Sequence, residues 1–149
     1  MDFSGHKNFQ LYHGQNILSV DYGTKVTGFA SFCPGREPYP IPYGTIRYVD
    51  DQSLCQSILK IVHQESIQLV VLGIPYLLDG KSTRMTEKIR QFGEKLQASI
   101  APVAFIFQDE TLSSYEALDR LNVAKKLGLA GPIDAVAATV ILEDFIRKS

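Results

Sequence analysis

Two short apolar runs, at residues 69–73 and 103–107, restrict the folds that this chain can adopt. A stretch with helical spacing, residues 82–100, separates them, and its predicted buried stripe is Met85, Ile89, Phe92 and Leu96. Strands joined through a helix run parallel and cross over in the right-handed sense. A continuous apolar run is typical of a strand covered on both faces, so we expect a parallel pair of strands inside an α/β sheet.

Three more strands are expected before these runs, at residues 17–21, 27–33 and 43–49. A glycine-containing turn joins the first two, and a loop with two prolines and a glycine follows the second. The three strands are therefore predicted to form an antiparallel meander that precedes the parallel pair.

Three further segments have helical spacing. The first follows its candidate cap, Asp51, and ends before residue 69. The second, residues 113–127, opens on a candidate capping box of Ser113 and Glu116. The third is Ile133–Arg147, whose inward-facing residues are predicted to be Val136, Val140, Ile141 and Phe145. This order of elements predicts a single α/β domain with a mixed five-stranded sheet flanked by helices.

Composition limits the class of protein. The chain has 149 residues, enough for one domain, and its net charge of −1 argues against binding nucleic acid by bulk positive charge. Its two cysteines, Cys33 and Cys55, have no metal-ligand spacing and fit a reducing compartment. Residues 1–16 form a polar lead-in without the apolar core of a signal peptide, and no run is long enough to cross a membrane. We expect a cytoplasmic protein with one domain over residues 17–149.

Three carboxylates lie where an enzyme would place reactive groups. Asp21 ends the first strand, and Gly23 and Gly28 allow the backbone around it to pass close to a ligand. Glu110 follows the last strand, and Asp134 lies at the start of the final helix. An ionised aspartate beside a buried strand is costly unless something pairs with it, so the three acids together suggest a divalent metal.

Three sequence blocks carry a family resemblance: residues 20–30, residues 108–114 and residues 133–138. They resemble the signature blocks of the YqgF family of nucleases, and residues 71–75 resemble a fourth block. The blocks occur in the family's order from about residue 17 to the C-terminus. The resemblance implies a ribonuclease H-like fold, which agrees with the predicted order of strands and helices.

The resemblance also implies an activity. Asp21, Glu110 and Asp134 match the family's acidic positions, which implies a nuclease that uses Mg²⁺ or Mn²⁺ to hydrolyse phosphodiester bonds. The implied substrate is the 5′ end of the 16S ribosomal RNA precursor, with branched DNA of the Holliday-junction type as the alternative. A monomer suffices for trimming RNA, whereas junction cleavage favours a symmetric homodimer.

Four basic residues are candidates for contact with the substrate: Lys25, Lys81, Arg84 and Lys88. Such residues bind phosphates, but Lys81, Arg84 and Lys88 are more typical of a solvated surface, and Lys25 is as typical of a solvated turn. The acids have structural alternatives too, because Asp134 would gain from the helix dipole and Asp21 would accept hydrogen bonds from the turn that follows it.

Two other functions are compatible with parts of the sequence. Residues 21–24 resemble the phosphate-binding turn of actin-like ATPases, although those enzymes need two lobes and this chain supplies one. A binding module without turnover is the second alternative. It gains support from Thr111, which stands where many members of the family have an arginine.

Overall fold

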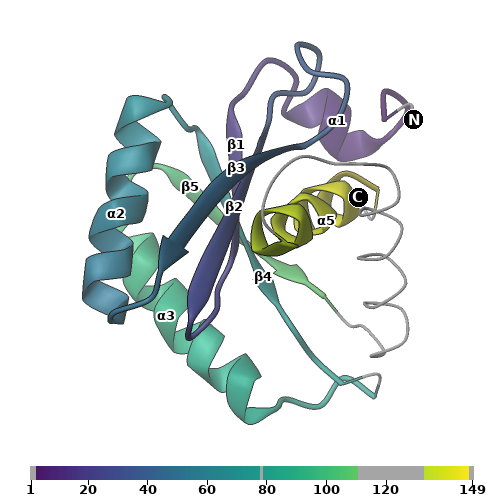
Figure 1. Cartoon of the computed structure of the whole chain (residues 1–149). Coiled ribbons are helices and arrows are strands. Elements are labelled where there is room, and N and C mark those ends of the chain that lie inside the picture. Colours follow the sequence, from purple (N-terminus) through teal and green to yellow (C-terminus); the bar gives the residue numbers. More distant parts are fainter. Residues whose placement is uncertain (1–2, 78, 111–132, 148–149) are drawn as a thin grey trace.

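The computed structural model describes residues 3–77, 79–110 and 133–147 (Figure 1). One five-stranded sheet has the order β3-β2-β1-β4-β5. Its strands are β1 (Ile17–Asp21), β2 (Val26–Phe32), β3 (Ile41–Arg47), β4 (Leu69–Ile74) and β5 (Ala104–Asp109). The first three strands pair antiparallel, and β4 and β5 run parallel to β1. The predicted mixed sheet is confirmed.

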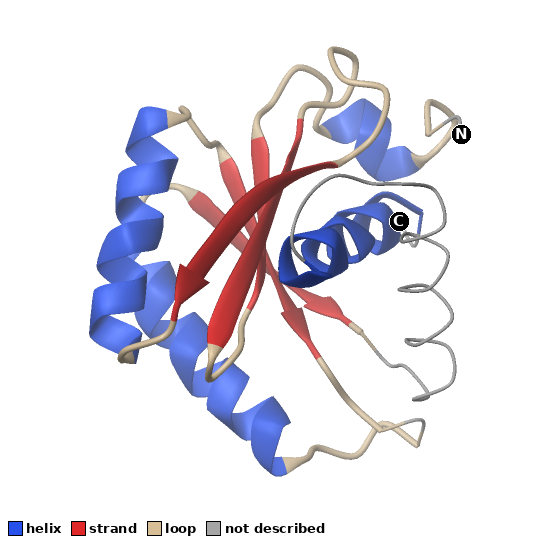
Figure 2. Cartoon of the chain, in the orientation of Figure 1, coloured by secondary structure: helices blue, strands red, loops and turns tan. Residues whose placement is uncertain are grey.

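Helices cover both faces of the sheet, as Figure 2 shows. On one side lie α2 (Asp51–Gln64) and α3 (Arg84–Ile100), and on the other lie α1 (Lys7–Leu11) and α5 (Ile133–Arg147). Side chains of β1 point alternately to the two faces. Leu18 and Val20 join the core under α2 and α3, whereas Ile17 packs with α5. Asp21 continues the Ile17 side of this alternation and so belongs to the face that α5 covers.

Helix α2 starts one residue away from its predicted cap. The Asp50 carboxylate accepts the Ser53 N–H at 2.7 Å and caps the helix, so Asp51 is its first residue and not the cap. Asp51 instead accepts the hydroxyls of Tyr22 and Tyr48, each at 2.8 Å. This carboxylate ties the turn after β1 to the start of α2.

Helix α3 differs from its prediction in its buried stripe. Thr83 caps the helix through a reciprocal pair of hydrogen bonds with Thr86, and the helix begins at Arg84. Thr86 is buried and donates its hydroxyl to the Pro75 carbonyl, while Met85 is 40% exposed. The prediction that Met85 is buried is therefore wrong. Thr86 takes the buried position instead, because its hydroxyl has a hydrogen-bond partner there.

Strand β5 lies at an edge of the sheet. Its residues are exposed or half-buried, so the prediction of a strand covered on both faces is wrong for this run, although it does pair parallel with β4. An apolar run alone does not distinguish an edge strand from a central one. The helix predicted at residues 113–127 lies outside the described residues.

The N-terminal segment, predicted as a polar lead-in, packs on the domain. The Phe3 side chain is 2% exposed and meets the Phe32 ring edge-on, with ring centroids 6.0 Å apart. Asn8 of α1 donates its side-chain N–H to the Phe145 carbonyl at 2.9 Å. The segment thus covers the end of α5, and its aromatic residues explain why.

Within the described residues, Cys33 and Cys55 are buried free thiols. None of the helices in the described ranges is long and apolar enough to cross a membrane.

Candidate active site

Asp21 stands at the carboxyl end of β1, on the face that α5 covers. Two residues earlier on that face, the Ser19 hydroxyl donates to the Ala138 carbonyl at 2.7 Å and holds α5 against the strand. Burial and the negative charge of Asp134 raise the pKa of Asp21 from 3.8 to about 7. The structure thus brings Asp21 and Asp134 close enough for their charges to interact.

Gly28 allows Asp134 to lie this close to Asp21, because it has no side chain in the way. It pairs with Asp21 across β1 and β2, and a Cβ atom at Gly28 would lie 2.0 Å from the Asp134 carbonyl oxygen. The first turn of α5 therefore rests directly on the glycine. The sequence led us to expect that Gly28 admits a ligand, but in the structure it admits the backbone of α5 and so delivers Asp134 beside Asp21.

Glu110 reaches the same end of the sheet from the other side. Its N–H donates to the Ile74 carbonyl at 2.9 Å, which extends the pairing of β5 with β4 by one step. The carboxylate-bearing side chain is largely buried, and its Cγ lies 3.5 Å from the position that a Cβ of Gly73 would occupy. Gly73 follows Leu72, the partner of Val20, so it lies next in register to Asp21. The Glu110 side chain therefore lies over Gly73, the residue of β4 beside Asp21.

Glycine is the neighbour of Asp21 on both sides, Gly28 in β2 and Gly73 in β4. The sequence analysis did not single out Gly73. A glycine inside a strand often marks a close approach of another group, and this signal was available in the apolar run of β4.

Aromatic residues of the core under α2 and α3 hold the turn after Asp21 in place. The Tyr22 ring lies 4.6 Å from the Phe92 ring and 5.8 Å from the Tyr48 ring, centroid to centroid. A Cβ at Gly23 would come within 2.2 Å of the Val26 carbonyl oxygen, so the tightness of this turn requires glycine. These contacts hold the carboxyl end of β1 in place.

The chemistry of these three side chains fits a divalent cation. Carboxylates are the hard oxygen ligands that Mg²⁺ and Mn²⁺ prefer, and the mutual charge of Asp21 and Asp134 is unfavourable until a cation compensates it. The described part of the chain contains no ready-made cluster of three acidic, histidine or cysteine side chains. The structure thus couples Asp21 to Asp134 and places Glu110 one strand away, without joining all three in a ligand set.

Two of the four candidate basic residues, Lys25 and Lys88, lie near Tyr48, and the other two, Lys81 and Arg84, lie at the start of α3. Lys25 lies in the turn between β1 and β2, and Lys88 of α3 places its Nζ 5.9 Å from the centre of the Tyr48 ring. Lys81 precedes α3 in a loop and lies 3.9 Å from an Asp79 carboxylate oxygen, with its side chain 78% exposed. Arg84 is the exposed first residue of α3. Thr111 lies outside the described residues.

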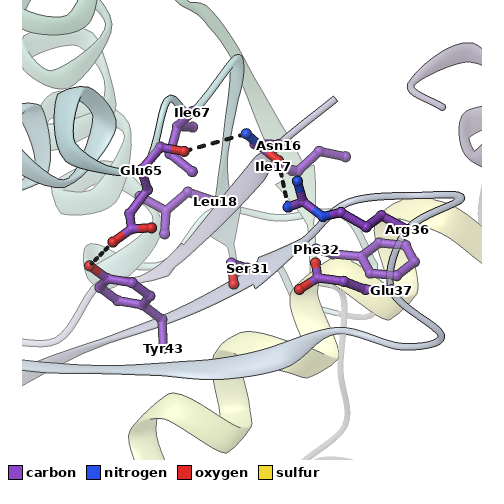
Figure 3. Close-up of a pocket in the computed structure, with 10 residues that line it drawn as sticks. All are labelled: Asn16, Ile17, Leu18, Ser31, Phe32, Arg36, Glu37, Tyr43, Glu65 and Ile67. Atoms are coloured by element: carbon purple, nitrogen blue, oxygen red, sulfur yellow. Dashed lines mark hydrogen bonds between the residues drawn. The ribbon is translucent and has the colours of Figure 1, made fainter. Parts of the chain in front are cut away.

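A pocket of about 120 Å³ lies at the opposite end of β1, as Figure 3 shows. Its polar side chains already pair with one another. Tyr43 donates to Glu65 at 3.2 Å, and Arg36 donates to Asn16 at 2.9 Å. This pocket is separate from the three carboxylates.

A mixed sheet with this strand order, covered by helices on both faces, is the ribonuclease H-like fold, and solved structures agree. A complex of Thermus thermophilus RuvC with a Holliday junction superposes with a TM-score of 0.58 at 10% identity, covering 91% of this chain and 96% of that one. The fowlpox virus Holliday junction resolvase gives a TM-score of 0.54 at 17% identity, covering 87% and 94%. The predicted fold class is confirmed.

Sequence comparison identifies the family. The model of the RuvX family, described as "Holliday junction resolvase", matches residues 15–148, and the chain belongs to this family. A relative from Maridesulfovibrio salexigens is 31% identical over 139 residues, covering 89% of this chain and 98% of its own length. One from Nitratidesulfovibrio vulgaris is 34% identical over 132 residues, covering 87% and 92%. Both carry the name "Putative pre-16S rRNA nuclease".

Proposed function

We propose that this protein is a metal-dependent nuclease that hydrolyses phosphodiester bonds at the 5′ end of the 16S ribosomal RNA precursor. The observation that carries the proposal is the approach of Asp134 to Asp21 over Gly28, which places two acids together at the end of the central strand and contributes to the raised pKa of Asp21. The names of the relatives support the substrate. We also propose a cytoplasmic location, where the precursor of ribosomal RNA would be processed.

Asp21, Glu110 and Asp134 are the residues that would hold the metal. A bound Mg²⁺ or Mn²⁺ ion supplies Lewis-acid activation of water and stabilises the departing oxygen. Asp21 and Asp134 must both be ionised to bind it, so their proximity makes cation binding favourable at neutral pH and above. Glu110 contributes a third carboxylate from the end of β5.

Lys25, Arg84, Lys88 and Lys81 complete the proposal as substrate contacts. All four are exposed, and they follow β1 or β4, the strands whose carboxyl ends lie beside Asp21 and Glu110. Lys81 is the weakest of them, because Asp79 already offsets its charge.

The test is a comparison of substrates under matched conditions. Labelled 16S precursor 5′ fragments, unrelated single-stranded RNA and four-way DNA junctions are incubated with Mg²⁺, Mn²⁺ or EDTA, and cut positions are mapped. The proposal expects metal-dependent cleavage near the mature 5′ end and slower cleavage of unrelated RNA. Absence of cleavage on every substrate would favour a binding module without turnover.

Branched DNA is the second candidate, because the matching family model is described as "Holliday junction resolvase". Junction cleavage requires two active sites related by symmetry, whereas trimming of RNA does not. Light scattering during gel filtration therefore separates the two. A stable homodimer that cuts junctions in preference to RNA would replace the ribosomal RNA assignment.

A further inference from the structure

Arg47, for which the sequence patterns predict no role, lies on the same face of the sheet as the carboxylates. It is the last residue of β3 and pairs with Val26 of β2. Two steps along the same ladder, Thr45 pairs with Gly28, which in turn pairs with Asp21. Opposed residues in an antiparallel pair point to the same face, so Arg47 and Asp21 share the face that carries α5.

Two of the candidate substrate contacts, Lys25 and Lys88, lie near this end of β3. The Tyr48 N–H donates to the Lys25 carbonyl at 2.9 Å, which places the turn after β1 beside the residue that follows Arg47. The Lys88 Nζ lies near the ring of the same tyrosine. Lys25, Arg47 and Lys88, which we call the hairpin cations, therefore lie around the end of β3. Arg47 is on the face that carries α5, and Lys88 is beside Tyr48 on the face that carries α3.

No carboxylate of the described residues neutralises the hairpin cations at close range. All three are exposed, and among the described residues none has a carboxylate oxygen within 4 Å. Four other basic residues do have a carboxylate oxygen within 4 Å: Lys81, Arg90, Lys95 and Arg147.

Nearby acids are already engaged. Asp51 accepts the Tyr22 and Tyr48 hydroxyls and lies 3.5 Å from Lys95. Asp50 caps α2 through the Ser53 N–H. In a chain whose net charge is −1, Lys25 and Arg47 thus place positive charge near the acidic end of β1.

We propose that Arg47, together with Lys25, binds a backbone phosphate next to the one that is cleaved, and so positions the nucleic-acid strand across the carboxylates. This inference rests on the proposed nuclease function. Adjacent strands lie about 4.8 Å apart, so the Cα atoms of Asp21 and Arg47 are separated by about 10 Å or more across β2. That separation suits a neighbouring phosphate, and the guanidinium fork suits two of its oxygens.

The experiment measures binding and turnover separately. Fluorescent single-stranded RNA and four-way DNA junctions are titrated with Arg47→Gln, Arg47→Lys and wild type in EDTA, at several salt concentrations. Lys60→Gln is the matched control, because it removes one exposed positive charge from α2. Thermal unfolding of each variant checks that the fold is intact.

We expect Arg47→Gln to weaken binding about fivefold at 0.1 M salt and to reduce the slope of log K against log salt by about 0.7 to 0.9. Arg47→Lys should retain the slope, since it keeps the charge. In the cleavage assay, Arg47→Gln should raise KM about fivefold with kcat changed by less than about twofold. Lys60→Gln should match wild type throughout.

The outcomes separate this inference from the nuclease proposal. If wild type cleaves and Arg47→Gln binds and cleaves as the control does, Arg47 has no role and the nuclease stands. If wild type binds without cleaving and Arg47→Gln still lowers the slope, the phosphate contact stands and the nuclease proposal fails. A protein that neither binds nor cleaves nucleic acid contradicts both.

Discussion

Asp21 shows how a single side chain links the fold to the proposed chemistry. Its carboxylate is partly buried at the end of β1, and Asp134 adds a second negative charge beside it. Both effects disfavour the ionised form and raise the pKa to about 7. Such a group destabilises the metal-free protein at high pH and favours a cation that would neutralise it.

The Asp21→Asn substitution should therefore stabilise the metal-free protein in a pH-dependent way. Between pH 3.8 and about 7 the native state binds a proton that the unfolded state has lost, so the stability of wild type falls as pH rises through this window. We expect the free energy of unfolding of Asp21→Asn to exceed that of wild type by about 1 to 3 kcal/mol at pH 8, and to match it near pH 4. Urea unfolding in EDTA at both pH values measures this difference. An equal or lower stability of the variant at pH 8 would contradict the assigned burial and charge.

The same ionisation predicts a coupling between metal and pH. Protons and cations compete for the Asp21 carboxylate, so activity at low Mg²⁺ should rise with pH through about 7. Increasing Mg²⁺ should move the midpoint of this rise to lower pH. Cleavage rates over a grid of pH and Mg²⁺ concentration test the coupling. A midpoint that does not move with Mg²⁺ would show that Asp21 does not bind the cation.

At the scale of elements, the contact between β2 and α5 decides whether the acids meet. Only a residue without a Cβ fits at Gly28, because the atoms it would strike belong to the backbone of Asp134 and Ala135 and cannot rotate away. At Gly73 the nearest obstacle is the flexible side chain of Ile141 instead. The two glycines beside Asp21 thus differ in how much change they tolerate.

Gly28→Ala should displace the start of α5 and lower the free energy of unfolding by about 3 kcal/mol. Gly44→Ala in β3 is the matched control, since a Cβ there meets nothing within 4 Å. Chemical denaturation of both variants gives the comparison. We also expect the pKa of Asp21, followed by NMR, to fall in Gly28→Ala as Asp134 moves away. Similar stabilities for the two variants would show that Gly28 does not set the position of α5.

Periodicity in the sequence predicted the elements well, because strand alternation and helical spacing are local properties. The bounds of β1 and of α5 agree with the predicted ranges, and the three acids were identified from their places at the ends of elements. Met85 was assigned to the wrong face because a hydrogen bond from Thr86 to Pro75, distant in sequence, outweighs the apolar pattern. Arg47 was missed because its place beside the site depends on the register between β2 and β3, which no local pattern reveals.

At the scale of the whole molecule, the N-terminal segment belongs to the folded unit. Phe3 and the end of α1 pack on α5, the helix that carries Asp134. These residues are predicted to form a polar lead-in, because their aromatic side chains are too widely spaced to form an apolar run. The segment thus helps to hold α5 against the sheet.

Phe3→Ala should lower the free energy of unfolding by about 3 kcal/mol, the usual cost of removing a buried aromatic ring. Leu11→Ala removes an apolar side chain that is exposed on the same segment, and it should change stability by less than about 0.5 kcal/mol. Thermal and urea unfolding of the two variants measures the difference. Equal effects would mean that the segment does not dock as described.

Cleavage of a labelled 16S precursor fragment by wild type, Asp21→Asn and Asp109→Asn, with and without Mg²⁺, tests the proposed active site most directly. Asp109 is the matched control, because it precedes Glu110 but is exposed and pairs with Ile74, which packs on the opposite face of the sheet. We predict Mg²⁺-dependent cleavage by wild type and Asp109→Asn, and a loss of at least about 100-fold in Asp21→Asn. Cleavage by Asp21→Asn at the wild-type rate would contradict the assignment of this carboxylate to the active site.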